Sequence, residues 1–304
     1  MKFNLLGTGG VTPIPKPCCN CELCVNARKS GLKDYQTGPS MFVYDDNILF
    51  DTPEEVRFQL NRENIEKVEN VILTHWHPDH TQGIRIVEQI NFNHIKERAE
   101  EKPINLYIAE KQLEMFKKFS CGNMLSYYES KGIIKIIYLK HNEPIQLKNT
   151  TITPYYIPKT EGYYFLVEDN KNGKKLIYAP CEYQELPVYN EIKDIDVLIA
   201  HCLYFENKRI GSGVDYSETE DSFEKMLLDS KKMEAKKILI THIEEAFQLT
   251  INQLNQEAKK YYENYNIEFA VENLRKHERV LNMVYKEPDK LLIHFLIKKF
   301  PLFH

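Results

Sequence analysis

The 304-residue sequence contains no long apolar run and no concentration of charge of one sign. A membrane span needs roughly 20 consecutive apolar residues, and the most apolar segment, residues 291–300, is interrupted by His294 and two lysines. The formal net charge is −4, and the basic residues are scattered along the chain, which removes the electrostatic basis for binding a nucleic acid. We therefore expect a protein that binds neither membranes nor nucleic acids and acts on a small molecule.

The N-terminal residues also lack the features of a secretory signal, because the short apolar run of MKFNLLGTGG meets glycines at once. We expect a cytoplasmic, reducing location. Four of the seven cysteines nevertheless lie together in CCNCELC, residues 18–24, and the others are Cys121, Cys181 and Cys202. In a reducing compartment such a cluster indicates a metal site rather than a set of disulfides.

Runs rich in β-branched and aromatic residues predict strands in residues 1–7, 40–52, 68–75, 104–109, 150–157, 163–169, 174–180, 196–201, 236–242 and 267–272. Apolar residues at helical spacing predict helices in residues 54–65, 83–101, 110–120, 219–235 and 249–265. Hairpin-like pairs dominate the first half, such as the two strands around Asn172-Gly173, whereas strands and helices alternate later. Two sheets packed face to face with helices outside would accommodate both patterns.

We expect one domain over residues 1–282, followed by a C-terminal extension over residues 283–304. The extension is apolar enough to pack either on its own domain or on a second copy of the chain in a homodimer.

The stretch THWHPDH, residues 74–80, follows the apolar run of a predicted strand. Imidazole nitrogens and a carboxylate oxygen are ligands that suit Zn, Fe or Mn. In an extended turn His75 and His77 share one face, and Asp79 and His80 point to a second position close by. This spacing suits a two-metal site, in which one ion activates water and the other orients a substrate oxygen. The alternative is a solvated, histidine-rich loop.

A His-x-His-x-Asp-His segment after a strand resembles the signature of the metallo-β-lactamase superfamily. The resemblance extends over about residues 1–282 and includes GTGG at 7–10, ILFDT at 48–52 and ILITH at 238–242. It implies a four-layer αββα sandwich of mixed α/β (α+β) class, with the site at one edge of the two sheets. It also implies that Asp51 supports the loop of metal ligands and that His242 is a metal ligand.

Two branches of the superfamily resemble this chain in carrying a cysteine-rich segment just after the first strand. One contains the cyclic phosphodiesterases of carbon–phosphorus lyase pathways, known as PhnP, and the other the PqqB proteins of pyrroloquinoline quinone biosynthesis. In the phosphodiesterase branch a catalytic histidine lies where this chain has Tyr204, whereas Tyr178-Ala-Pro180 matches a Tyr-x-Pro segment of the PqqB branch.

The chain departs from the complete dinuclear site of such hydrolases at two positions. The resemblance places a third histidine at Ile157 or Pro158 and a bridging aspartate at Pro180, and neither ligand is present. The available replacements are Cys181, Glu182 and His201. His201 ends an apolar strand, where it would be a ligand or a general acid, or simply a histidine hydrogen-bonded at a strand end.

Within the cysteine cluster, Cys19, Cys21 and Cys24 have the spacing C-x-C-x-x-C. Three thiolates in a tight loop can hold one zinc ion, which needs a single further ligand. In the phosphodiesterase branch that ligand is a histidine, and the corresponding residue here is Glu245; Cys18 or a residue more distant in the sequence are alternatives. A set of reduced thiols without a metal is the competing interpretation.

The resemblance implies a metal-dependent hydrolase acting on a small phosphodiester, linear or cyclic, or on another ester. We expect Asp79 and His201 to be its catalytic residues. One or two ions of Zn, Mn or Fe would lower the pKa of bound water toward about 7 and create hydroxide, which Asp79 would position or deprotonate. The expected ligands are His75, His77, Asp79, His80 and His242. One alternative is a PqqB-like protein with a single metal in cofactor or peptide-modification biosynthesis. The other is a non-catalytic metal-binding protein with a degenerate second site.

Overall fold

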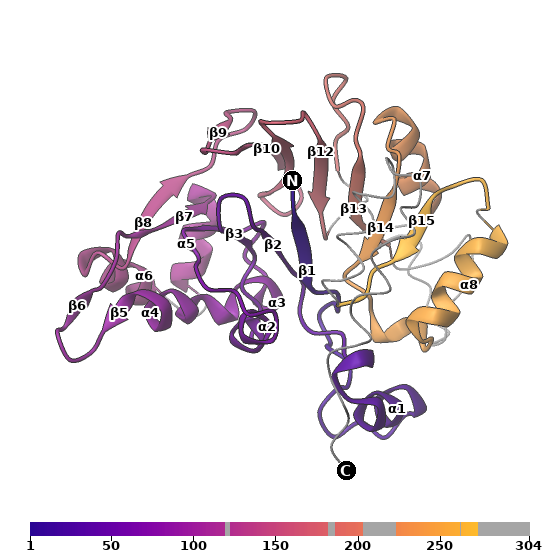
Figure 1. Cartoon of the computed structure of the whole chain (residues 1–304), viewed down its shortest axis with the longest axis horizontal. Coiled ribbons are helices and arrows are strands. Elements are labelled where there is room, and N and C mark those ends of the chain that lie inside the picture. Colours follow the sequence, from indigo (N-terminus) through magenta and orange to yellow (C-terminus); the bar gives the residue numbers. More distant parts are fainter. Residues whose placement is uncertain (119–121, 182–185, 203–222, 262, 273–304) are drawn as a thin grey trace, which may run out of the picture.

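The computed structural model describes residues 1–118, 122–181, 186–202, 223–261 and 263–272. Within these ranges two β-sheets lie against each other and helices cover their outer faces (Figure 1). This is the αββα arrangement that the sequence predicted. The proposed extension at 283–304, together with Glu182 and Tyr204, lies outside the described residues.

The first sheet has the strand order β1-β2-β3-β4-β7-β8. Its strands are Phe3–Gly7, Ser40–Val43, Ile48–Phe50, Asn70–Ile72, Ile104–Ile108 and Ile134–Tyr138. The first three are antiparallel, and β3, β4, β7 and β8 run parallel. Parallel neighbours need crossover connections, and the helices in those connections are α2 (Val56–Arg62), α3 (Pro78–Thr81), α4 (Ile86–Asn91), α5 (Glu110–Phe116) and α6 (Gly122–Ser130).

The second sheet has the order β15-β14-β13-β12-β11-β10-β9. Its strands, from β9 to β15, are Ile145–Gln146, Thr150–Ile157, Gly162–Asp169, Lys175–Ala179, Val197–His201, Ile238–Thr241 and Ile267–Phe269. The strands β9 to β12 are antiparallel and β12 to β15 are parallel. The helices α7 (Phe223–Lys232) and α8 (Ile251–Tyr261) follow β13 and β14. The described residues include no helix with the length and apolar character of a membrane span.

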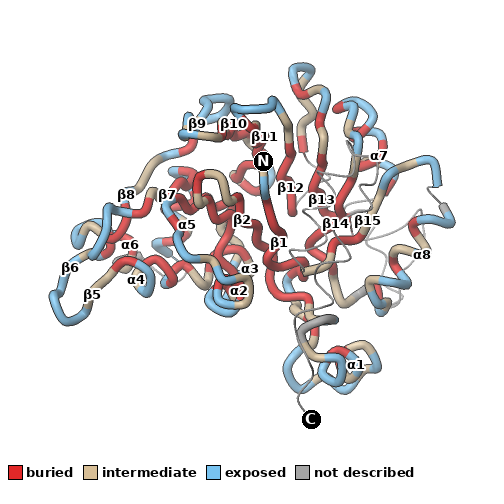
Figure 2. Tube along the Cα trace, viewed as in Figure 1, coloured by how far each residue is buried: buried red, intermediate tan, exposed pale blue. Residues whose placement is uncertain are grey.

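Three apolar layers hold the sheets and helices together, and the strands that carry them are mostly buried (Figure 2). On β11, Tyr163, Phe165 and Val167 face the layer between the two sheets, whereas Tyr164 and Leu166 face the layer beneath α7 and α8. Side chains alternate between the faces of a strand, so a strand covered on both sides has apolar residues at successive positions. This explains the continuous apolar runs that predicted the strands.

The structure corrects the helix predicted over residues 83–101. A 3₁₀ turn (Gln82–Arg85) and the short helix α4 are followed by a hairpin of β5 (Phe92–Asn93) and β6 (Arg98–Ala99). The side chain of Asn93 accepts hydrogen bonds from the backbone N–H groups of Ile95 and Lys96, which turns the chain out of the helix. The helices α1 (Glu22–Ser30) and α6 and the strands β8 and β9 were not predicted.

Candidate metal centre

Five strands of the two sheets end at one edge of the sandwich and place a polar residue there. In chain order these are Asp51 after β3, His75 beyond β4, Cys181 after β12, His201 at the end of β13 and His242 after β14. The carboxyl ends of parallel strands are the usual place for a ligand in α/β sheets. The fold therefore gathers residues that are up to 191 positions apart in the sequence.

Metal-binding atoms lie close together in two overlapping groups at this edge. One contains His75, His80 and Cys181, and the other Asp79, His80 and His242; within each group the atoms lie within 4.8 Å of one another. Asp79 and His80 come from α3, whose single turn begins at Pro78, so that both side chains point back toward the strand ends. His80 belongs to both groups and is fully buried.

Each of the three histidines in these two groups has an oxygen of the protein beside its Nδ1 atom. The pairs are His80 with Asp51 and His75 with Thr74, both at 2.9 Å, and His242 with Glu244 at 3.1 Å. Such contacts fix the orientation of an imidazole ring and leave Nε2 for a metal. The Asp51 carboxylate also accepts hydrogen bonds from the backbone N–H and the hydroxyl of Thr74.

The backbone is strained at two of these positions. Asp51 has a φ of 60° and His242 a φ of 55°, in the left-handed region that side chains other than glycine rarely adopt. Backbone strain of this kind is concentrated at functional sites, where the surrounding structure maintains it. In Asp51 and in His242, this backbone conformation directs the side chain toward the cluster of metal-binding atoms.

The residues fit a divalent metal ion. Within the described part of the chain, the buried Nε2 atoms of His75 and His80 make no hydrogen bond, and a buried polar atom without a partner is unfavourable. Imidazole, carboxylate and thiolate donors together suit Zn or Fe. A metal ion among them would satisfy the orphaned nitrogen atoms.

Charged neighbours shift the pKa values of Cys181 and His80 in opposite directions. Burial raises the pKa of Cys181, but the positive charges of His242 and His75 outweigh burial and hold the pKa well below its ordinary value. Burial lowers the pKa of His80, yet the carboxylates of Asp79 and Asp51 raise it to about 10. The thiol is therefore ready to ligate as a thiolate, whereas a metal has to displace a proton from His80.

Two predicted site residues lie at the margin of the centre. The ring centroid of His77 lies 4.5 Å from that of His75, but among the described residues His77 belongs to neither group. The ring of His201 lies 4.7 Å from that of His242, and the two form a third group with Glu244. Asp79 and His80 therefore stand nearer to the other donors than His77 does.

Ile157 lies where the family resemblance places a third histidine. It lines a small pocket with His75 and Cys181 and contributes its side chain to the apolar layer under α7 and α8. Of the three suggested replacements, Cys181 lies within the first group and His201 within the third. In the sequence, the position of Cys181 directly after a predicted strand indicated that its side chain would lie at this edge.

The sequence did not predict Glu244, although the GTGG segment contained a signal for it. A Cβ atom on Gly10 would lie 1.9 Å from Oε1 of Glu244 and 2.8 Å from Nδ1 of His242. The backbone N–H of Val11 donates to the same Glu244 oxygen at 3.0 Å. A side chain at position 10 would therefore displace Glu244 or His242.

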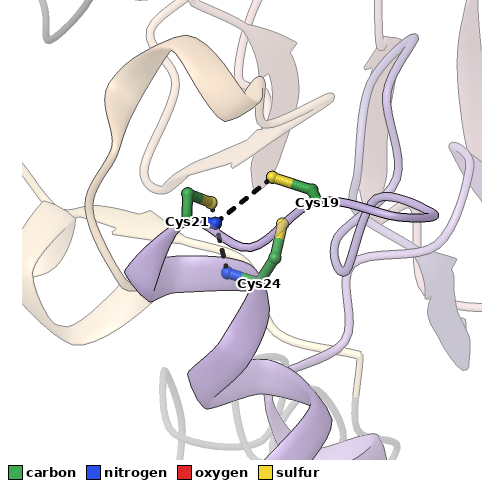
Figure 3. A group of neighbouring side chains, drawn as sticks. All are labelled: Cys19, Cys21 and Cys24. Carbon is green, nitrogen blue, oxygen red and sulfur yellow. Dashed lines mark hydrogen bonds between the residues drawn. The ribbon is translucent and has the colours of Figure 1, made fainter.

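A second metal-binding group lies at the start of α1, where the sulfur atoms of Cys19, Cys21 and Cys24 are within 4.8 Å of one another (Figure 3). The Cys21 thiol caps the helix by accepting from the backbone N–H of Cys24, which lowers the pKa of Cys21. Burial raises the pKa of Cys24 to about 11. Sulfur atoms around one zinc stand about 3.8 Å apart when Zn–S is about 2.3 Å, so the group fits zinc.

Residues 46–243, more than half of the chain, match the family model of the β-lactamase superfamily domain. The chain belongs to this superfamily. It superposes on a diphosphatase of the PhnP family with a TM-score of 0.67 and 22% identity, over 89% of this chain and 94% of that one. Zinc-bound PqqB from Methylobacterium extorquens gives a TM-score of 0.66 and 17% identity, over 89% and 98%. These superpositions show the metallo-β-lactamase fold.

A relative in sequence is the octanoyltransferase of Porphyromonas gingivalis, which is 26% identical over 160 residues. The match covers 52% of this chain but 30% of that protein. The chain therefore matches less than a third of the relative's length.

Proposed function

We propose that the chain is a metal-dependent hydrolase with one active-site metal held by Asp79, His80, Cys181 and His242. The observation that supports this most strongly is the convergence of these donors at one strand edge, where a carboxylate oxygen lies beside Nδ1 of His80 and of His242. Three protein ligands with an open fourth position are typical of a catalytic zinc site, and a fourth protein ligand leaves an open position only where the metal takes five ligands. A second metal would have only His75 and the shared thiolate close by, since His77 stands apart.

When bound, the metal supplies a Lewis acid and lowers the pKa of water. Burial raises the pKa of Asp79, but His80 and His242 outweigh it and keep the pKa well below its ordinary value. The carboxylate therefore stays ionised and orients hydrogen-bond donors, and it is a poor proton acceptor. We assign proton transfer to the leaving group to His201, which ends β13 beside His242.

The substrate that we propose is a small phosphodiester, linear or cyclic. This proposal is supported by the likeness of the cysteine-rich segment to the phosphodiesterase branch and by the PhnP-family name of a structural neighbour. At 22% identity that neighbour shares the fold, and a fold does not fix a substrate.

An acyl ester or thioester is a second candidate, and the similarity to an octanoyltransferase favours it. The same metal centre would serve acyl transfer to water, because a Lewis acid polarises a carbonyl as it does a phosphoryl group. A third candidate is a PqqB-like role without hydrolysis, which the Tyr178-Ala-Pro180 segment and the superposition on PqqB support.

The test compares hydrolysis by the wild-type chain with that by His80→Ala, each loaded in turn with Zn, Mn or Fe. The substrates are bis-p-nitrophenyl phosphate, 2′,3′-cyclic nucleotides and p-nitrophenyl octanoate. His94→Ala is the matched control, since His94 is exposed in the β5–β6 turn. We expect His80→Ala to lose activity on phosphodiesters and His94→Ala to retain it. Equal activity in all three proteins would exclude catalysis at this centre, and activity on the octanoate alone would favour the acyl candidate.

A further inference from the structure

Tyr178, on β12, packs against the end of β3 on the other sheet. Its side chain is buried in the layer between the two sheets, and 1% of the residue is exposed. The centroid of its ring lies 5.2 Å from that of Phe50, with the ring planes tilted by 55°. Phe50 is followed directly by Asp51, which is fully buried and contacts Nδ1 of His80. A tyrosine of the second sheet therefore lies next to the carboxylate behind a metal ligand of the first.

The hydroxyl group of Tyr178 lies beside the Asp51 carboxylate. Burial raises the pKa of Tyr178 well above its ordinary value, and the charge of Asp51 raises it further. The phenol is therefore protonated at neutral pH and can donate one hydrogen bond. Its buried oxygen atom makes no hydrogen bond of good geometry within the described ranges. A buried hydroxyl without a partner is unfavourable, and the adjacent carboxylate can accept a hydrogen bond from it.

Asp51 has the capacity for one more donor. A carboxylate offers about four lone-pair sites. Thr74 donates to it twice, through its backbone N–H at 2.8 Å and through its hydroxyl at 3.0 Å, and Nδ1 of His80 lies at 2.9 Å. Thr74 and His80 both follow β4 of the first sheet. Tyr178 would be the donor that the second sheet contributes.

We propose that Tyr178 is a positioning residue of the metal centre, whose hydroxyl donates to Asp51 and thereby holds the imidazole of His80 with Nε2 toward the metal. This role depends on the proposed function, in which His80 binds the metal. Partners behind a ligand fix the orientation of its ring. Because Tyr178 and Asp51 belong to different sheets, the contact also ties the orientation of His80 to the docking of the sheets. A phenylalanine would fill the same apolar layer without making this contact.

The first experiment compares the full-length wild-type chain with Tyr178→Phe and Tyr163→Phe, and it makes no use of hydrolysis. Tyr163 is a matched control, because it faces the same layer and its hydroxyl donates to the backbone carbonyl of Leu139 at 3.2 Å. Each variant loses one buried hydroxyl and keeps its ring. The affinity of the active-site zinc is measured by competition with a chelator. Proton NMR of the zinc form follows the Nδ1–H resonance of His80, which is assigned by its absence in His80→Ala.

We expect Tyr178→Phe to bind the active-site zinc about tenfold more weakly, at the lower end of the 10- to 100-fold cost of losing an outer partner of a metal ligand. Its Nδ1–H resonance should also shift, because the acceptor of that proton has lost another donor. Tyr163→Phe should keep the wild-type affinity and resonance, although it too loses a buried hydrogen bond. An affinity and a resonance in Tyr178→Phe equal to those of Tyr163→Phe would overturn the inference.

The second experiment asks whether Tyr178 acts through Asp51, by adding Tyr178→Phe to Asp51→Asn. Asp51→Asn alone should weaken zinc binding by about 10- to 100-fold. In that background Tyr178→Phe should have little further effect, because the carboxylate that receives the hydroxyl is already gone and coupled residues are not additive. Effects of the two substitutions that multiply in full would show that Tyr178 acts by packing alone, against the inference.

His80→Ala separates this inference from the proposed function. If His80→Ala binds zinc at the centre as tightly as the wild-type chain does, His80 is not a ligand and both proposals fail. If His80→Ala loses this zinc and Tyr178→Phe binds it like the wild-type chain, the metal centre stands and the role of Tyr178 alone fails.

Discussion

Cys181 borders His75 and His242 close to the position where the family resemblance places a bridging aspartate. A thiolate is a softer donor than a carboxylate and favours Zn or Fe over Mn and Mg. We therefore expect a cysteine in place of the aspartate to change which metal the centre selects. It also makes the centre sensitive to oxidation of one sulfur atom.

Cys181→Asp should lower the affinity for Zn relative to Mn, because it replaces a soft donor by a hard one. The measurement is the Zn-to-Mn ratio bound after dialysis against an equal mixture of both ions. Cys18→Ser is the control, since Cys18 is exposed and outside the metal groups. An unchanged ratio in Cys181→Asp would show that Cys181 does not touch the metal.

Glu244→Gln should weaken metal binding at the active site by about 10- to 100-fold, the usual cost of removing a carboxylate behind a histidine ligand. The measurement is competition with a chelator, monitored on the wild-type chain and the variant. Loss of metal from the cysteine group alone would contradict the role assigned to Glu244.

The affinity of the active-site metal should rise with pH. His80 has a pKa of about 10 before metal binds, so its proton must leave when the metal enters. His242 must also lose a proton when the metal enters. Burial lowers the pKa of His242, but Cys181 and Asp79 raise it well above the ordinary value. Calorimetry from pH 6 to pH 8 should show affinity rising by about one to two powers of ten per pH unit. An affinity independent of pH would mean that neither histidine is a ligand.

At the scale of elements, the strands were the most predictable part. β11 and β13 are covered on both faces, so their apolar runs are continuous and their prediction needed no tertiary information. The helix α1 was missed because its first turn is capped by the thiol of Cys21, a signal that belongs to the metal loop. The hairpin of β5 and β6 was missed because one side chain, Asn93, overrides a helical pattern.

The site was predictable to the extent that its residues are adjacent in the sequence. The segment 74–80 and His242 were predicted from a motif and its resemblance. The contact of Glu244 with Gly10, in contrast, joins residues 234 positions apart and follows from the packing of two loops. The sequence also left Cys181, Glu182 and His201 as equal candidates for the missing ligands. Selecting Cys181 required knowing which strand ends lie together in the fold.

Gly10→Ala should destabilise the chain by about 1–3 kcal/mol, the usual cost of an overpacked contact, because its Cβ would overlap Glu244. Gly132→Ala is the comparison, since Gly132 has open space around it but a φ of +69°, where a side chain costs about 1–2 kcal/mol. Urea denaturation gives the free energy of unfolding of each variant, and metal analysis gives its metal content. Only Gly10→Ala should also lose active-site metal. If both variants keep this metal, Glu244 is excluded as a positioning residue.

At the scale of the molecule, the metal centre lies where the two sheets meet. Asp51 and His75 come from the first sheet, and Cys181, His201 and His242 from the second. These residues come together only when both sheets are folded and docked. We therefore expect metal binding to be coupled to folding of the whole sandwich.

The number and position of the metal ions is the central claim, and metal analysis of the purified full-length chain tests it most directly. We expect about two zinc or iron ions per wild-type chain, and about one in His80→Ala and in Cys24→Ser, each variant losing a different ion. About three ions in the wild-type chain would contradict the single-metal centre. A single ion that His80→Ala retains would contradict an active-site metal altogether.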